Sequence, residues 1–224
     1  MRALAVLGVN TGVGKTHVAA MLLRGLQRVR ELRVAPFKPL ESGVELYDGV
    51  PQDAQKLLEA SGRSLALDAV CPWQLPRPVA PADELERLDI RVSLDDIEAA
   101  AHRLVQGDDK PNLLFEGAGG VLSPLTWAVN GTHVAKRLDA GVWLVAKDEL
   151  GALSQILVNI EVLRARGLHV MGVVLNRFPN EDSIAEGKNA AALQRLGLSK
   201  VWRATEDFLD ASVVAESSVW YRQR

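Results

Sequence analysis

The sequence has a single cysteine, Cys71, among its 224 residues. One cysteine excludes a disulfide framework within the chain, so we expect a protein of a reducing compartment, the cytoplasm. The chain also lacks an uninterrupted apolar stretch of the ~18 residues that a membrane span requires. The apolar run at residues 3–7 is too short and too early for a signal peptide. We therefore expect no membrane partner.

The chain also has no excess of positive charge, because it contains 26 lysines and arginines and 28 aspartates and glutamates, for a net charge of −2. General nucleic-acid binding needs a basic surface, so nucleic acid is not an expected partner. The four histidines are scattered without the spacing of a metal site. Neither a Gly-x-Ser-x-Gly nor a His-Glu-x-x-His motif occurs. Cys71 is expected to be a buried thiol and not a nucleophile.

What the chain does contain is an alternation of apolar runs and helical patterns. Hydrophobic residues make up 48% of it and charged residues 24%, as in ordinary globular domains. No repeat, low-complexity tract or linker interrupts residues 1–224, so we expect one domain. The alternation predicts an α/β fold of three layers, in which a mostly parallel central sheet carries helices on both faces.

The element boundaries follow from periodicity and from cap and breaker residues. The expected strands cover residues 3–8, 32–37, 112–115, 142–146, 170–175 and 201–204. The expected helices begin at Lys15, at Asp53 (ending at Gly62), at Ser93 with a Ser-x-x-Asp cap, at Thr132 as a cap, near Leu150 (ending at Gly167), at Asp182 or Ser183 (ending near Gly197) and at Glu206 (ending at Glu216). Residues 38–43 and 71–82 are expected to be loops, the second because prolines crowd into it.

The stretch from Gly8 to Thr16 carries the strongest chemical signal. It reads Gly-Val-Asn-Thr-Gly-Val-Gly-Lys-Thr between an expected strand and an expected helix. The N–H groups of such a turn and the N-terminus of the helix favour an anion. Lys15 adds a full charge, and Thr16 adds a hydroxyl of the kind that ligates Mg²⁺. The ordinary pattern needs glycine where Val9 stands, so we predict a phosphate-binding loop that is one residue longer than usual.

Three further side chains favour the same chemistry. Glu116 ends an apolar strand and precedes Gly-Ala-Gly-Gly, which is unusual for a solvated charge. Asp53 is either a helix cap or, with Thr16 and Glu116, an oxygen donor for Mg²⁺, and both interpretations stay open. Lys38 lies between a strand and a proline that holds its backbone extended, so its ammonium is placed to stabilise a transferring phosphoryl group.

These signals fall at the expected carboxyl ends of the parallel strands, at residues 8–16, 38–43, 116–120 and 176. In open α/β sheets, ligands bind beyond those ends. Residue chemistry and sheet topology are independent signals, so their agreement predicts a single site.

Taken together, the motifs resemble those of the dethiobiotin synthetase family, the ATP-dependent ligases of biotin synthesis. The resemblance covers roughly residues 1–179 in the family's order. It rests on Gly8-x-Asn10-Thr11-Gly12-Val13-Gly14-Lys15-Thr16, Lys38-Pro39-x-x-Ser42-Gly43, Asp53-Ala54, Glu116 to Gly120, Ser123-Pro124-Leu125, Leu150-Gly151 and Asn176. The longer phosphate loop and the Lys-Pro-x-x-Ser-Gly motif are themselves family traits.

The resemblance implies an enzyme that converts 7,8-diaminononanoate, CO₂ and ATP into dethiobiotin, ADP and phosphate. A carbamate forms on one amine, ATP phosphorylates it, and the second amine closes the ureido ring. Such chemistry is mostly positioning and charge stabilisation, so it needs no protein nucleophile. The resemblance also implies a homodimer, in which the substrate site takes residues from the partner subunit, including the start of the Leu150 helix.

The family's roles carry over to individual residues of this chain. The resemblance assigns catalysis to Lys38, Lys15 and Thr11, and substrate binding to Ser42, Thr11, Gly119 and Ser154. It assigns ATP binding to Gly12, Val13, Gly14, Lys15, Thr16, His17, Asp53, Glu116, Gly117, Ala118, Gly119, Asn176 and Arg177. It assigns Mg²⁺ to Thr16, Asp53 and Glu116, and the adenine edge to Asn176.

Three alternatives stay open. A ParA/MinD-type partitioning ATPase carries a signature lysine five residues before the Gly-Lys-Thr lysine, where this chain has Asn10. An amidating synthetase of the cobyrinate type needs a glutaminase domain, for which this chain is too short. The third is a diverged homologue that binds nucleotide without synthase activity, because Ala82 and Ser154-Gln155 stand where the family often has histidine and Asn-His.

Overall fold

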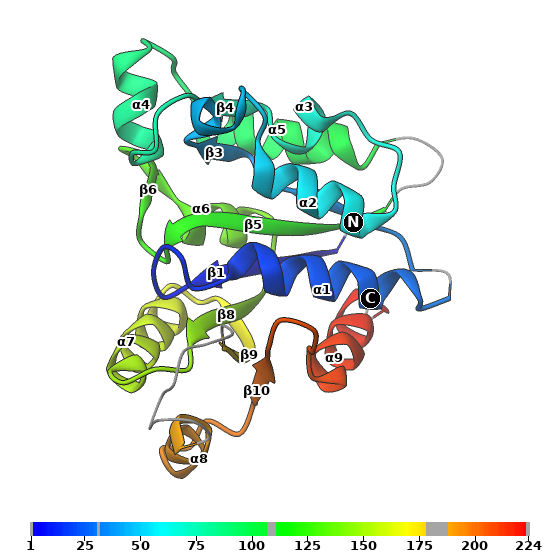
Figure 1. The fold of residues 1–224 in the computed structure, drawn as a ribbon, viewed down its shortest axis with the longest axis vertical. Coiled ribbons are helices and arrows are strands. Elements are labelled where there is room, and N and C mark those ends of the chain that lie inside the picture. The colour runs from blue at the N-terminus through cyan, green and yellow to red at the C-terminus, as the bar shows by residue number, and fades with distance from the viewer. Residues whose placement is uncertain (1, 31, 107–110, 178–187, 223–224) are drawn as a thin grey trace.

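The computed structural model describes residues 2–30, 32–106, 111–177 and 188–222 (Figure 1). Its centre is a parallel sheet built from β1 (Ala3–Gly8), β2 (Val34–Phe37), β5 (Asn112–Gly120), β8 (Gly141–Lys147), β9 (His169–Asn176) and β10 (Val201–Ala204). The order across the sheet is β10-β9-β8-β1-β5-β2. β1 is central, and its register pairs Leu4 with Leu114 on one side and with Gly141 on the other. The expected α/β class and parallel sheet are confirmed.

The apolar runs become strands because both faces of the sheet are covered. All six residues of β1 are buried, and they alternate between two cores. Ala3, Ala5 and Leu7 face one core, while Leu4 and Val6 face the other. A strand that is buried on both sides is typical of a central position in a parallel sheet.

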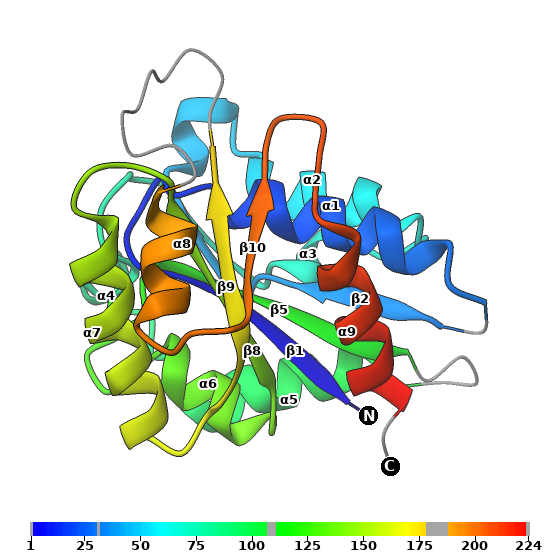
Figure 2. The same cartoon turned by 90° about the horizontal axis from the view of Figure 1, so that it is seen from below.

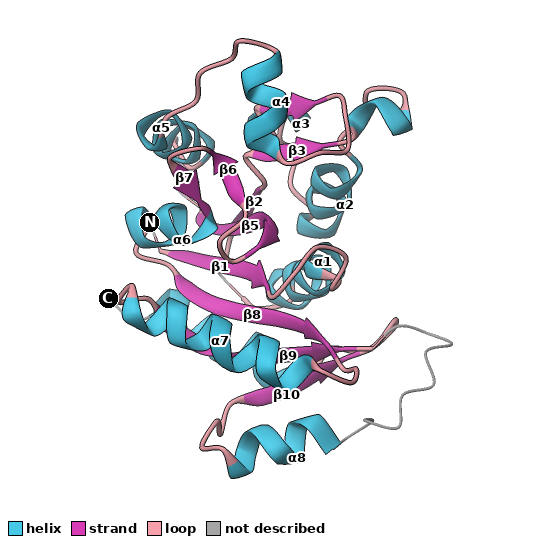
Figure 3. Ribbon diagram, turned by 90° about the vertical axis from the view of Figure 1, so that its left-hand side faces the viewer, coloured by secondary structure: helices cyan, strands magenta, loops and turns pink. Residues whose placement is uncertain are grey.

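The helices form the two outer layers, as Figures 2 and 3 show from two directions. One face carries α5 (Leu94–Leu104), α6 (Gly131–Arg137), α7 (Ala152–Ala165) and α8 (Lys188–Arg195). The other carries α1 (Lys15–Gln27), the end of α2 (Gln52–Ser61) and α9 (Ala211–Arg222). None of the helices in these described ranges is long and apolar enough to cross a membrane.

Capping residues explain where several helices begin. Ser93 and Asp96 form the expected capping box of α5. Thr132 was expected to cap α6, which is wrong, because the Asn130 side chain accepts the hydrogen bond from the Thr132 N–H and so serves as the cap. The last helix also starts later than the expected Glu206, because the chain first bridges Ala204 to Leu209. The predicted start of α8 at Asp182 or Ser183 lies outside the described residues.

The two expected loops hold regular structure that the sequence pattern concealed. Residues 38–43 contain β3 (Leu40–Ser42), which pairs in parallel with β4 (Trp73–Leu75) in the proline-rich stretch. The same stretch ends in α4 (Pro81–Arg87), since proline fits the first turn of a helix. The elements α3 (Leu67–Val70), η1 (Val44–Tyr47), β6 (Pro124–Thr126) and β7 (Val129–Asn130) were also not predicted. The Cys71 thiol is fully buried here, and its burial raises its pKa.

Candidate functional site

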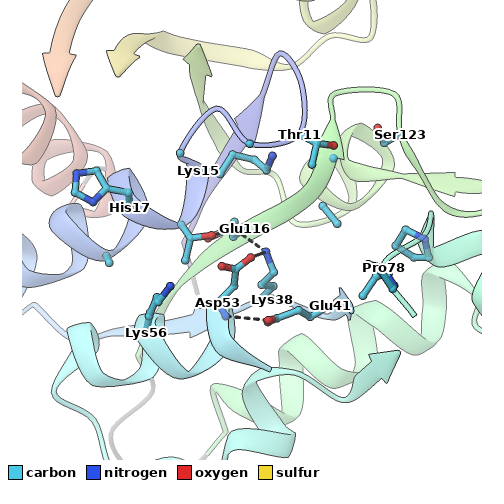
Figure 4. Close-up of a pocket in the computed structure, with 18 of the residues that line it drawn as sticks. Thr11, Lys15, His17, Lys38, Glu41, Asp53, Lys56, Pro78, Glu116 and Ser123 are labelled. Atoms are coloured by element: carbon cyan, nitrogen blue, oxygen red, sulfur yellow. Dashed lines mark hydrogen bonds and ion pairs between the residues drawn. The ribbon is translucent and has the colours of Figure 1, made fainter. Parts of the chain in front are cut away.

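The phosphate-binding loop connects β1 to α1 at the carboxyl edge of the sheet (Figure 4). Gly14 precedes the first helical residue with a φ of 88°, and Gly12 has a φ of 72°. Both angles lie in the left-handed region, which glycine enters without steric cost. Lys15 is buried at the start of α1, and its Nζ donates to the Asn10 carbonyl at 3.0 Å. The loop therefore folds back over its own lysine at a helix N-terminus, which favours anions.

Lys38 lies at the centre of a second group of charges below this loop. Its Nζ is 2.6 Å from Glu116 Oε1 and 2.9 Å from Asp53 Oδ2. Only 3% of Lys38 and 1% of Glu116 is exposed. The Thr16 hydroxyl donates to the same Glu116 oxygen at 2.8 Å. We call Lys38, Glu116, Asp53 and Thr16 the Lys38 cluster; Figure 4 shows its three charged side chains converging.

The electrostatics of these lysines differ although they share one site. Burial opposes the charge on Lys38, but the carboxylates of Glu116 and Asp53 outweigh it and raise the pKa of Lys38. Burial likewise opposes charge on Asp53, yet Lys38 outweighs it and holds the pKa of Asp53 below its usual value. Lys15 makes no ion pair of this kind with the residues that the structure describes, and its burial lowers its pKa to about 8, against the opposing effect of Glu116.

Glu41 settles whether Asp53 is a helix cap. The cap position of α2 is Pro51, so Asp53 lies within the first turn and the expected cap at Asp53 is wrong. The Glu41 carboxylate instead accepts the N–H groups of Asp53 at 2.8 Å and Ala54 at 2.9 Å. Burial raises the pKa of Glu41. With its backbone held in this way, the Asp53 side chain turns toward Lys38.

A cavity of about 1030 Å³ opens over the loop and the Lys38 cluster. Twelve of the predicted site residues line it: Thr11, Gly12, Gly14, Lys15, Thr16, His17, Lys38, Ser42, Asp53, Glu116, Ala118 and Gly119. The structure thus brings together residues that are more than 100 positions apart in the sequence. These residues meet at the carboxyl ends of the strands, where topology predicted a site.

Five predicted site residues lie outside that lining: Val13, Gly117, Asn176, Arg177 and Ser154. Val13 is buried, and its side chain belongs to the core on the α1 side of the sheet. Asn176 is buried at the end of β9, where its Nδ2 donates to the Val13 carbonyl at 3.1 Å and so supports the phosphate loop from behind. Gly117 packs so closely on Leu7 that a Cβ at this position would lie 2.8 Å from the Leu7 Cδ2. Arg177 follows β9 and pairs its backbone N–H with Ala204. Ser154 is exposed on α7.

The cavity also has walls that the sequence did not point to. Residues 78–81 line one side, and Lys56 lines it from α2. Ser123 contributes a hydroxyl that accepts the Gly120 N–H at 2.7 Å. For Glu41 there was a local signal, since it lies inside the Lys-Pro-Leu-Glu-Ser-Gly motif next to Lys38. For residues 78–81 the signal was the crowding of prolines, which predicted a loop but not its position at the cavity. That position depends on the pairing of β3 with β4.

The Lys38 cluster offers oxygen donors of the kind that Mg²⁺ takes. Thr16, Asp53 and Glu116 lie together, and Glu116 Oε2 is buried with no hydrogen-bond partner among the described residues. In the part of the chain that the structure describes, no group of three or more histidine, cysteine, aspartate or glutamate side chains could hold a metal alone. Two carboxylates and a hydroxyl suit an ion that takes its remaining ligands from water and nucleotide phosphates, so these residues fit Mg²⁺.

Comparison with solved structures shows which fold the chain has. It matches a ParA family ATPase from Chlorobium tepidum with a TM-score of 0.53 at 17% identity, covering 98% of this chain and 92% of that one. It matches the cell division protein FtsY from Thermotoga maritima with a TM-score of 0.52 at 15% identity, covering 99% and 69%. At such identities the likeness shows the fold alone, which is that of the P-loop NTPases.

Comparison of sequences is more specific. Residues 2–213 match the protein-family model described as an AAA domain. The ATP-dependent dethiobiotin synthetase of Anaeromyxobacter dehalogenans (strain 2CP-1) is 40% identical over 196 residues, which cover 88% of this chain and 86% of that protein. The corresponding enzyme of Caulobacter vibrioides (strain NA1000) is 34% identical over 212 residues, covering 94% and 92%. This chain belongs to the dethiobiotin synthetase family.

Proposed function

We propose that the chain is an ATP-dependent dethiobiotin synthetase that closes a ureido ring from 7,8-diaminononanoate and CO₂. The observation that carries this proposal is the buried Lys38 between a phosphate-binding loop and a cavity, in a chain of this family. A cation fixed at that point suits a reaction in which a carbamate and a phosphate, both anions, must approach each other.

The proposed reaction uses the chain's own groups to hold and neutralise charge. One substrate amine adds to CO₂ to give a carbamate, whose oxygen attacks the γ-phosphorus of ATP and displaces ADP. The second amine then attacks the carbamate carbon, the ring closes, and phosphate leaves. Lys15 and the loop N–H groups hold the phosphates, while Lys38 neutralises the carbamate and the oxygens of the transferring group.

The last part of the proposed mechanism is the orientation of the two reactants by side chains that line the cavity. Thr11 and Ser42 line the cavity beyond Lys38. No residue in the described part of the chain hydrogen-bonds the buried Ser42 hydroxyl, so we assign this hydroxyl to a substrate amine. Thr16, Asp53 and Glu116 would hold Mg²⁺, which supplies charge neutralisation at the phosphates when bound. The side chains thus position two reactants at one point, and such positioning is a large part of the catalysis of group transfer.

The proposal extends to a homodimer in the cytoplasm. Leu150 at the start of the α7 region is 92% exposed, and Ser154 is exposed on the same helix. Such an apolar group in water favours burial against a partner. We infer that this helix start meets the substrate site of a second copy of the chain.

Product formation is the direct test. The protein, incubated with ATP, Mg²⁺, diaminononanoate and bicarbonate, is expected to yield dethiobiotin by mass spectrometry, with one ADP for each product. Omission of the diamine should remove most ATP turnover. If no product forms and DNA or lipid stimulates ATP hydrolysis instead, the chain is a partitioning ATPase; if nucleotide binds without either response, it is a diverged homologue.

A further inference from the structure

The segment that joins β4 to α4, residues 76–81, forms one wall of the cavity through Pro78, Val79, Ala80 and Pro81. Its first part is tied to the backbone at the end of β3. The Gly43 N–H donates to the Leu75 carbonyl at 2.9 Å, and the Glu45 N–H donates to the Pro76 carbonyl at 3.1 Å. Gly43 also lies so close that a Cβ there would be 3.2 Å from the Cβ of Pro78. These contacts hold the beginning of the segment. Other groups hold the side of the segment that faces α4.

Those other groups meet at Glu84, whose side chain is fully buried under the segment. Its carboxylate accepts the Arg77 backbone N–H at 3.4 Å and Arg77 Nε at 2.6 Å, and it accepts Arg87 Nε at 2.8 Å and Nη2 at 2.6 Å. Arg87 and Arg77 together lower the pKa of Glu84 to about 2. The carboxylate is therefore charged at any physiological pH and fully engaged.

The two arginine side chains are similarly exposed, but Arg87 gives Glu84 two side-chain hydrogen bonds and Arg77 gives it one. Their side chains are 46% and 44% exposed, and each approaches Glu84 to 2.6 Å. Arg87 belongs to α4 itself, three residues from Glu84, so its bond stays inside one helix. Arg77 belongs to the cavity segment, directly before Pro78. A buried carboxylate needs a countercharge, and Arg87 already supplies one. The bond from Arg77 therefore has a different effect, which is to tie segment 76–81 to α4.

We propose that Glu84 is a positioning residue which, through Arg77, holds segment 76–81 in place as the wall of the diamine subsite. This inference rests on the proposed function. In Figure 4, Pro78 lies on the side of Thr11 and Ser123, away from His17 and the start of α1. The segment therefore borders the end of the cavity near Thr11, which is assigned to the diamine, and lies away from the helix N-terminus that is assigned to the phosphates. A wall that is already ordered lowers the entropy lost when a flexible substrate binds.

The matched pair Arg77→Ala and Arg87→Ala tests the proposal. Arg77→Ala should raise KM for diaminononanoate about tenfold, with kcat and KM for ATP within about twofold of wild type, because only the diamine wall is released. Arg87→Ala should leave all three near wild type. Glu84→Gln, which keeps the shape and removes the charge, should reproduce the effect of Arg77→Ala, and Arg77→Lys should restore part of the wild-type KM.

A second measurement does not depend on catalysis. Hydrogen exchange at the amides of Gly43, Glu45, Arg77, Val79 and Ala80 should become faster in Arg77→Ala and stay as in wild type in Arg87→Ala. Equal exchange in the two variants, or equal KM values, would overturn the proposal. If the wild-type protein makes no dethiobiotin, the proposed function fails, while the exchange comparison still decides whether Arg77 and Glu84 hold the segment.

Discussion

Replacing Lys38 with alanine is expected to lower kcat for dethiobiotin formation by about 10²–10³-fold, the usual effect of removing one group that stabilises transition-state charge. The affinity for ADP should stay within a few-fold of wild type, because the loop N–H groups and Lys15 remain. Lys38 is 3% exposed and held by Glu116 and Asp53, so solvent cannot readily supply a substitute charge at that point. Product formation and ADP titration measure the two quantities separately.

The same substitution is expected to destabilise the fold, and this must be separated from the chemistry. Removing one partner of a buried ion pair costs about 3–5 kcal/mol, because the remaining charge stays buried. Glu116, at 1% exposure, would be that charge. The double variant Lys38→Met/Glu116→Gln removes both charges with little change of shape. Its thermal stability should recover most of the loss while its activity stays low. A double variant that regained activity together with stability would contradict the proposed role of Lys38.

The strands and the phosphate loop could be predicted because their signals are local. The apolar run of β1 predicts a strand by itself. Gly12, Gly14 and Lys15 lie within four residues of one another and predict the phosphate-binding loop without reference to distant parts of the chain. Lys38 and Glu116 could be assigned to the site as well, since each follows an apolar run and parallel strands bring their carboxyl ends to one edge. Topology therefore linked residues 78 positions apart without any knowledge of contacts. The strand β5 in fact continues past Glu116 to Gly120, which the glycines there concealed.

The failures share a different cause, which is competition between distant groups. Asp53 has the sequence of a helix cap, but Glu41, twelve residues earlier, accepts the N–H groups at the start of α2. Three-residue strands such as β3 and β4 are too short to show the alternation of apolar and polar residues that predicts a strand. Their pairing therefore depends on contacts with the rest of the fold. Glu84 likewise looks like any surface acid of a helix until the fold buries it between two arginines.

Replacing Lys15 with methionine is expected to weaken ADP binding by about 10- to 100-fold, since a hydrogen bond to a charged group contributes about 1.5–3 kcal/mol. Lys15 is buried at the first position of α1 and lines the cavity. The loop N–H groups remain in the variant, so binding should be weakened and not lost. Calorimetric titration of ADP into both proteins at pH 7 measures the difference, and an unchanged affinity would remove Lys15 from the phosphate site.

The pH dependence of ADP binding tests the same lysine without removing it. Burial lowers the pKa of Lys15 to about 8 in the free protein. A bound phosphate favours the charged form and raises that pKa, so above pH 8 binding must take up a proton. By linkage, the affinity of the wild-type protein should then fall by up to about tenfold for each pH unit. Below pH 8 the lysine is already charged, and this dependence should disappear.

Lys15→Arg is the control for this pH effect, since a guanidinium keeps its charge throughout this range. Lys38 also stays charged, because Glu116 and Asp53 raise its pKa, so it adds no slope of its own. The arginine variant should bind ADP with an affinity that is flat between pH 7 and pH 9.5, whatever its absolute value. A slope that persisted in Lys15→Arg would assign the titration to another group, whereas its loss would show that a single desolvated lysine sets the pH response of the phosphate loop.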